Sequence, residues 1–357
     1  MRQSLNLVLI ILLLLASCTK TPEVITIGFM GPLSGDAASY GQSVQRGVDL
    51  AKKDMALRNV AVVYEDSKCD GKDAATAIHK LIALNNVQAI IGEVCSGATL
   101  AAAPIVNENS VVLISSASTS PDLTPAGDYI LRVIPSDALQ GAFGAKLVKE
   151  KGYKTLAVLY SNEEYGVGFN KVLVEEFEKL GGNIVAQEAV ERGNTDLRSS
   201  VTKIKNAKPE AVYLIANSPD TATAALKQLR ELGVQAQLFG SEAFKDSAII
   251  KAAGDAAEGL VFTSVSSGSP EFVESYMIEY GVPPGPFAAQ GYDAFKALAL
   301  AIKSGAETGV EIKEALKNVE FEGVSGSIKF DEHGDIAGNY EVYIVKEGNA
   351  VIEKTES

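Results

Sequence analysis

The chain has 357 residues, 46% of them hydrophobic and 22% charged, which is typical of globular proteins. At roughly 150 residues per domain, this length is enough for about two lobes with separate cores. The net charge of −13 argues against nucleic acid as a partner, because phosphate contacts need a basic surface, and two histidines with three cysteines argue against a zinc cluster. We therefore expect neither a metal nor a cofactor.

The N-terminus has the pattern of an export signal. Arg2 precedes an uninterrupted apolar run from Leu7 to Leu15. Nine such residues are too few to cross a hydrocarbon core of about 30 Å, but they match the apolar part of a signal peptide. We therefore assign residues 1–17 to a removable leader and exclude them from the fold.

Directly after this run, Leu15-Ala16-Ser17-Cys18 resembles a bacterial lipobox. In a lipobox the cysteine receives a diacylglycerol group and becomes the new N-terminus, and each buried methylene of the lipid contributes about 0.8 kcal/mol to anchoring. The alternative is an ordinary signal peptidase site with an incidental cysteine. We expect an exported protein, held at the cell envelope by lipid on Cys18 without spanning the membrane. The anchor would be periplasmic or on the outer face of the cytoplasmic membrane, and residues 18–23 would form a tether.

Strands and helices alternate through the first part of the mature chain. Apolar periodicity predicts strands at 24–30, 60–64, 89–91 and 111–114, and helices at 41–57, 74–84 and 98–106. This segment also contains Cys69 and Cys95. In an exported chain they can form a disulfide, which would add roughly 3 kcal/mol of stability in the chain-entropy model. Two reduced, buried thiols are the alternative, and we predict the disulfide.

The alternation restarts after residues 129–133. We expect helices at 138–151, 168–180, 197–206 and 221–232 with a short one near Ser247, and strands at 155–160, 183–189, 211–216, 237–240 and 260–263. Alternating strands and helices predict parallel sheets covered by helices on both faces. The fold class is therefore α/β, with two doubly wound lobes.

The last third of the chain has a different order of elements. Helices are expected at 270–280, 288–304 and 310–319, followed by short strands at 326–330, 340–345 and 351–353. Residues Asp331 to Asp335 read Asp-Glu-His-Gly-Asp, a composition that favours a tight turn between two strands.

The sequence offers no catalytic motif. Gly166-Val167-Gly168 lacks the third glycine of a dinucleotide fingerprint, and no Gly-x-Ser-x-Gly elbow occurs. His79 lies in a predicted helix and His333 in the predicted turn, so no histidine adjoins a nucleophile in sequence. A hydrolase that uses serine-rich loops stays an alternative, but the base it needs is not evident, and we expect a binding protein.

Hydroxyl-rich loops follow two buried strands. Ser96 and Thr99 come after the strand at 89–91, and residues 115–120 read Ser-Ser-Ala-Ser-Thr-Ser after the strand at 111–114. In open α/β sheets, ligands bind at the carboxyl ends of strands, where hydroxyls and helix N-termini can receive an anion such as a carboxylate. The alternative is that Ser96 and Thr119 only cap the helices that follow them.

Several short motifs, including these hydroxyl-rich loops, follow one another along nearly the whole mature chain. They are Gly31-Pro32-Leu33-Ser34-Gly35 with Tyr40-Gly41, Cys69 with Cys95-Ser96, Ile114 to Pro121, Tyr165-Gly166, Gly240-Ser241-Glu242 and Phe330 to Asp335. In this order they resemble the periplasmic type I binding proteins, specifically the branch that binds leucine, isoleucine and valine and serves ABC uptake systems. The resemblance implies a clamp that delivers a free amino acid to a membrane permease.

The resemblance also implies roles for individual residues. The ligand carboxylate would meet Ser96 and Thr119, and the ammonium group would meet the carbonyl of Ala117 and the side chain of Glu242. The side-chain pocket would be walled by Tyr40, Val94, Tyr165 and Phe244. A buried zwitterion must have both ends satisfied, which agrees with this division.

Asn217 departs from the pattern, because the branched-chain binders carry an aromatic residue at this place. Leucine would leave an amide in the pocket unpaired, so Asn217 would suit a ligand with a polar side chain or a bound water, unless it points away from the site. We expect a branched-chain amino acid or another small aliphatic or polar one. The same fold could instead serve as a receptor for a short amide or a carboxylate.

The resemblance further implies three chain crossings between the lobes, near Ser136, Val265 and Gly326. One lobe would comprise residues 24–136 and 266–326, and the other residues 137–265 and 327–357. We expect this three-crossover hinge to close around the ligand. A carrier of this kind needs only one subunit, so we expect a monomer.

Overall fold

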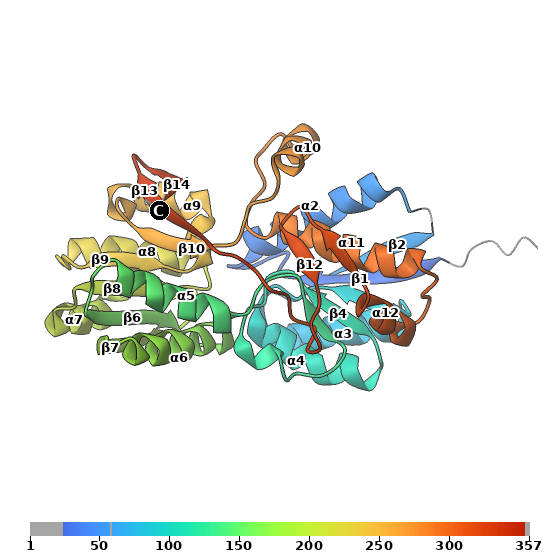
Figure 1. Cartoon of the computed structure of the whole chain (residues 1–357), viewed down its shortest axis with the longest axis horizontal. Coiled ribbons are helices and arrows are strands. Elements are labelled where there is room, and N and C mark those ends of the chain that lie inside the picture. The colour runs from blue at the N-terminus through green and yellow to red at the C-terminus, as the bar shows by residue number, and fades with distance from the viewer. Residues whose placement is uncertain (1–23, 58, 354–357) are drawn as a thin grey trace, which may run out of the picture.

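The computed structural model of the chain describes residues 24–57 and 59–353 (Figure 1). The predicted leader, Cys18 and the tether lie outside these residues. The described part forms two α/β lobes side by side, with the segment that contains helix α10 (Pro270–Tyr280) projecting beside the junction. In the described residues, no helix is both long and apolar enough to cross a membrane, and no three His, Cys, Asp or Glu side chains are grouped as metal ligands would be.

The first lobe is built on a five-stranded parallel sheet. Its order is β2-β1-β3-β4-β5, with bounds β1 Ile25–Gly31, β2 Val60–Asp66, β3 Ala89–Ile91, β4 Val112–Ser115 and β5 Ile130–Arg132. The helices of this lobe are α2 Ala38–Met55, α3 Gly71–Ala83, α4 Ser96–Glu108, α11 Ala288–Lys303 and α12 Gly309–Leu316, with the short 3-10 helix η1 Pro121–Leu123. Helices α11 and α12 return from the end of the chain, so the lobe is discontinuous in sequence.

The second lobe has a seven-stranded sheet in the order β14-β13-β10-β9-β8-β6-β7. Its strands are β6 Thr155–Ser161, β7 Asn183–Val190, β8 Ala211–Ile215, β9 Gln237–Gly240, β10 Val261–Ser264, β13 Glu341–Lys346 and β14 Asn349–Ile352. Five strands are parallel, and β13 and β14 extend the sheet in antiparallel fashion. The helices are α5 Asp137–Glu150, α6 Glu164–Lys179, α7 Arg198–Ala207, α8 Pro219–Glu231 and α9 Ser247–Ala253, with η2 Glu242–Lys245 and η3 Gly254–Ala257.

Strand β8 shows why the second sheet is covered on both faces. Its five residues are all apolar or aromatic and all buried. Because side chains alternate across a strand, Val212 and Leu214 enter one core, and Tyr213 and Ile215 enter the other. Burying such a side chain contributes roughly 1.5–3 kcal/mol, so the strand is stable only between two helical layers. This confirms the doubly wound α/β lobes.

The predicted elements agree with the structure in type, with two differences that concern the lobes. The antiparallel pair β13–β14 extends a lobe that we expected to be purely parallel, and a short strand β11 (Glu320–Glu322) pairs with β12 (Ser327–Lys329). Ile328, Phe330 and Ile336 are buried in the core of the first lobe. The division of the chain at Ser136, Val265 and Gly326 stays a prediction, and for its third boundary we propose a crossing after Ile336.

Candidate functional site

A small cavity lies where the two lobes meet. Its lining comes from both lobes and largely from loops at the carboxyl ends of strands: Tyr40, Val94, Ser96, Ala117, Tyr165, Ala216, Asn217, Glu242, Ala243 and Phe287. The structure thus brings together seven of the predicted site residues, and two others, Thr119 and Phe244, are not in the lining.

Ser96 marks the part of the cavity suited to an anion. It is the first residue of α4, is 1% exposed, and its Oγ accepts a hydrogen bond from the N–H of Ser120 at 3.2 Å. Backbone N–H groups in a first helical turn have no partners within the helix and attract negative charge. The helix cap is Cys95, and the cap of η1 is Ser120. The alternative that Ser96 and Thr119 serve only as caps is therefore wrong.

Thr119 lies just outside the lining and is 1% exposed. Its Oγ1 is buried and has no hydrogen-bond partner among the described residues. Its carbonyl oxygen accepts from Nη1 of Arg132 at 3.0 Å and from the N–H of Asp137 at 2.8 Å. The backbone of this loop is therefore fixed. The hydroxyl lies near the carboxyl of Asp137 but makes no hydrogen bond of normal geometry with it, so a ligand that reaches Thr119 would satisfy a buried polar group.

The second lobe contributes a buried acid. Glu242 is the first residue of η2, is 5% exposed, and accepts a hydrogen bond from Nε2 of Gln140 at 2.9 Å. Asp137, the first residue of α5, is fully buried, and its carboxylate has no hydrogen-bond partner among the described residues. Burial raises the pKa of both carboxyls, and the charge of Glu242 adds to the rise in the pKa of Asp137. Such an acidic pair can be stabilised by a cation.

Aromatic side chains from both lobes form the walls. The hydroxyl of Tyr165 donates a hydrogen bond to Oγ of Ser241 at 2.8 Å, which holds the ring in place. Tyr165 lies in the first turn of α6, which is capped by Glu163 and begins about one turn earlier than the sequence predicted. The buried hydroxyl of Tyr40 has no partner among the described residues, and its ring meets Phe287 edge to face at 5.9 Å. The described walls are thus apolar with one unpaired hydroxyl.

Two wall predictions need comment. Phe244 is not a wall residue: it is fully buried in the core of the second lobe, with its ring against Gly240. Phe287 lines the cavity and was not predicted. Its backbone has a positive φ of 64°, which a bulky residue rarely adopts, and it follows a proline-rich loop that carried no periodic signal. Asn217 is half-buried in the lining, and its N–H donates to Oγ of Ser161 at 3.0 Å.

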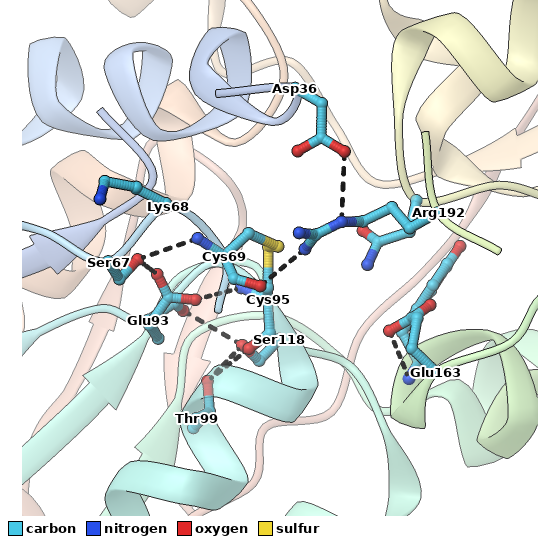
Figure 2. The surroundings of a disulfide bond; sticks show 12 residues. Asp36, Ser67, Lys68, Cys69, Glu93, Cys95, Thr99, Ser118, Glu163 and Arg192 are labelled. Atoms are coloured by element: carbon cyan, nitrogen blue, oxygen red, sulfur yellow. Dashed lines mark hydrogen bonds and ion pairs between the residues drawn. A yellow bond between two sulfur atoms is a disulfide. The ribbon is translucent and has the colours of Figure 1, made fainter. Parts of the chain in front are cut away.

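Cys69 and Cys95 form a disulfide beside the anion side of the cavity, with Cα atoms 5.4 Å apart (Figure 2). Glu93 lies beneath it and is fully buried. Its carboxylate accepts hydrogen bonds from the hydroxyl of Ser67 and, at 2.6 Å, from the N–H of Cys95. Burial raises the pKa of Glu93 to about 7. These contacts fix the backbone that leads into Ser96.

The loop after β4 is braced in the same way. Ser115 and Ser118 donate to the carbonyl oxygen of Glu93 at 2.6 and 3.1 Å, and the hydroxyls of Ser118 and Thr99 lie 2.6 Å apart. The hydroxyls of Ser115, Ser118 and Ser120 therefore shape the loop, whereas those of Ser116 and Thr119 have no hydrogen-bond partner among the described residues. Their local sequence does not distinguish them from their neighbours.

Comparison with known proteins agrees with this architecture. The family model described as "Periplasmic binding protein" matches residues 24–350. A leucine-, isoleucine-, valine-, threonine- and alanine-binding protein of Pseudomonas aeruginosa is 29% identical over 336 residues, covering 90% of this chain and 89% of its own.

Two solved structures have the same fold. A leucine-binding protein of Thermotoga maritima has a TM-score of 0.88 at 30% identity, covering 93% of this chain and 98% of its own. A branched-chain amino acid transporter substrate-binding protein of Streptococcus pneumoniae, in complex with isoleucine, has a TM-score of 0.85 at 29% identity, covering 93% and 99%. With the family model matching nearly all of the described residues, this chain belongs to the periplasmic binding protein family.

Proposed function

We propose that this protein is the extracytoplasmic substrate-binding component of an ABC uptake system. It clamps a free amino acid between its lobes and presents it to a membrane permease. The observation that carries the proposal is the cavity enclosed by both lobes, with Ser96 at a helix N-terminus and the buried Glu242 in its lining. The ligands printed for the relatives, among them leucine and isoleucine, support an amino acid.

In the proposed complex, the two charged ends of the ligand meet different lobes. The carboxylate accepts hydrogen bonds from the hydroxyls of Ser96 and Thr119 and from the first turn of α4, because these are the donors available in the first lobe. The ammonium group meets the carbonyl of Ala117 and the carboxylate of Glu242. A ligand with only one of these charges leaves a buried polar group unsatisfied, which is costly.

The side chain of the ligand lies among Tyr40, Val94, Tyr165 and Phe287, with Asn217 at the edge. The small volume and the aromatic walls favour a branched-chain or other small amino acid. Closure about the crossings near Ser136 and Val265 would bring the two half-sites together, as in other hinged binding proteins. The protein acts as a monomer anchored by lipid on Cys18.

Equilibrium dialysis of the full chain against radiolabelled leucine, isoleucine, threonine and valine tests the proposal. We expect at least one of them to bind with a dissociation constant in the micromolar range or below. Competition by the other unlabelled amino acids then ranks the side chains. Failure of all amino acids to bind, or to raise the melting temperature, would contradict the proposal.

A second experiment tests the lipid anchor separately. Mass spectrometry of the N-terminal peptide from cells that export the protein should find Cys18 as the first residue, carrying diacylglycerol and a further acyl group or a free amine. A Cys18→Ser variant should be released from membranes. An unmodified Cys18 within a longer N-terminus would show that the segment is not a lipobox.

A further inference from the structure

A single arginine of the second lobe bonds to two places on the first lobe (Figure 2). Arg192 follows β7 in the loop that leads to α7. Its Nη1 donates to the carbonyl oxygen of Cys69 at 2.6 Å, and its Nε lies 3.3 Å from Oδ2 of Asp36. Elsewhere in the described residues, ion pairs stay within one lobe or its connecting segments, whereas this pair joins the loops of the two sheets.

Both acceptors belong to segments that reach the ligand cavity. Asp36 lies in the loop before α2, four residues before Tyr40. Cys69 is joined by the disulfide to Cys95, which directly precedes Ser96. Arg192 itself is not among the lining residues. It therefore contacts the supports of the binding residues without contacting the ligand.

The local backbone is shaped for this contact. Lys68 and Cys69 both have positive φ angles, 52° and 61°, and the N–H of Cys69 donates to Oγ of Ser67 at 3.3 Å. This turn presents the carbonyl of Cys69 to Arg192. On the other side, Gly193 has a φ of 77°, and a Cβ there would lie 3.2 Å from Oδ2 of Asp36. The positive φ and this short distance favour glycine at position 193.

The surroundings of Arg192 are acidic. Burial raises the pKa of Glu163 and that of Glu93, each to about 7, and the positive charge of Arg192 opposes the rise in both pKa values. These acids come from different lobes. The arginine side chain is 24% exposed, so its interactions are screened by water less than those of a fully exposed pair.

We propose that Arg192 is a closure clasp, which holds the two lobes together through Cys69 and Asp36 and so sets how long a bound ligand stays. When the lobes separate, the guanidinium loses both acceptors and returns to water, so its bonds favour the closed state alone. A group that stabilises only the closed state raises affinity by shifting that equilibrium. The proposal rests on the proposed function because its main readout is a bound amino acid.

Rapid-dilution dissociation of radiolabelled leucine from the full chain tests the clasp. Because a hydrogen bond to a charged group is worth about a factor of 10 or more in an equilibrium constant, Arg192→Ala should speed dissociation about 10-fold. Association should change little. Asp36→Asn and Arg192→Lys should each produce part of this effect, because each keeps one of the two contacts. Isoleucine and leucine should be affected equally, since Arg192 does not contact the side chain of the ligand.

Arg198→Ala is the matched control. Arg198 begins α7 a few residues further on, pairs only with Asp196 within its own lobe, and is 71% exposed, so its removal should leave dissociation unchanged. An unchanged dissociation rate in Arg192→Ala, or a loss of affinity that arises from slower association, would overturn the clasp.

Amide hydrogen exchange on the ligand-free chain separates this proposal from the proposed function. The ligand-free chain opens and closes reversibly, and Arg192→Ala should lower its closed fraction. Residues 67–70 should therefore exchange faster in this variant than in the wild type, while the core strands stay protected. Binding of no amino acid by the wild type would contradict the proposed function, and the exchange result would still decide the clasp. Identical exchange at residues 67–70 in both proteins would then overturn it.

Discussion

At the scale of single residues, the site depends on polar groups left without partners in a buried place. Thr119 and Tyr40 each have a buried hydroxyl with no hydrogen-bond partner in the described chain, whereas the neighbouring Ser115 and Ser118 are fully engaged. An unpaired buried group typically costs about 1–3 kcal/mol, and a ligand that bonds to Thr119 or Tyr40 would offset this cost. The preference for one ligand side chain over another should depend on unpaired polar groups in the same way.

Asn217 should favour a hydroxyl on the ligand. Threonine and valine have nearly the same shape, so their relative affinity measures the hydrogen bond alone. We expect threonine to bind up to about 10-fold more tightly than valine, the worth of one neutral hydrogen bond, and Asn217→Leu to remove this preference. Competition dialysis measures both ratios, and the exposed Asn206→Leu serves as control. Equal affinity of the wild type for threonine and valine would show that Asn217 does not bond to the side chain of the ligand.

Glu93 should make stability depend on pH. Its pKa is raised by burial from 4.5 to about 7, so between these values the unfolded chain releases the proton while the folded chain keeps it. The free energy of unfolding should therefore fall as pH rises through this window, by an amount on the order of 3 kcal/mol. In urea unfolding, the free energy of unfolding of Glu93→Gln should not show this decrease with pH. The control Glu108→Gln, at an exposed position, should show the same decrease as the wild type. The full slope persisting without Glu93 would contradict this assignment.

At the scale of elements, the turn from Asp331 to Asp335 does more than join strands. Asp335 accepts from Nε and Nη2 of the buried Arg132 at 2.6 and 2.8 Å, and the other nitrogen of that guanidinium holds the carbonyl oxygens of Thr119 and Ser120. The turn from Asp331 to Asp335 thus supports the loop that contains Thr119.

Asp335→Ala should therefore weaken both the fold and the site. It leaves the buried Arg132 without its carboxylate, a change that typically costs about 3–5 kcal/mol. Chemical unfolding should show this loss, and leucine binding should weaken with it. Glu332→Ala, in the same turn but with its side chain 87% exposed, should change neither. A loss of stability below about 0.5 kcal/mol for Asp335→Ala would mean that Arg132 holds the loop without Asp335.

The elements also show what a sequence can and cannot predict. The burial of β8 on both faces can be read from its unbroken apolar run. Glu242 lines the cavity, and the signal that singled it out was the resemblance of its motif to a known family, while its contact with a ligand ammonium group stays a prediction. Phe244, two residues later, was misplaced because η2 turns it into the core, and an irregular turn has no period from which to read its buried face. Phe287 was missed because a left-handed backbone after prolines aims its ring at the cavity.

At the scale of the whole molecule, two lobes with their own cores line one cavity together. Ser96 and Ala117 come from the first lobe and Tyr165 and Glu242 from the second. A binding site divided in this way links occupancy to the arrangement of the lobes, which is what a permease could recognise.

Calorimetry of the full chain with leucine, 4-methylpentanoate and isoamylamine tests the central claim most directly, because the last two lack the ammonium group and the carboxylate respectively. The account predicts that leucine, or whichever amino acid binds best, binds at least about 100-fold more tightly than its two analogues, and that Glu242→Gln removes most of the advantage over the acid. Equal affinity for leucine and 4-methylpentanoate in the wild type would contradict a clamp built for an α-amino acid.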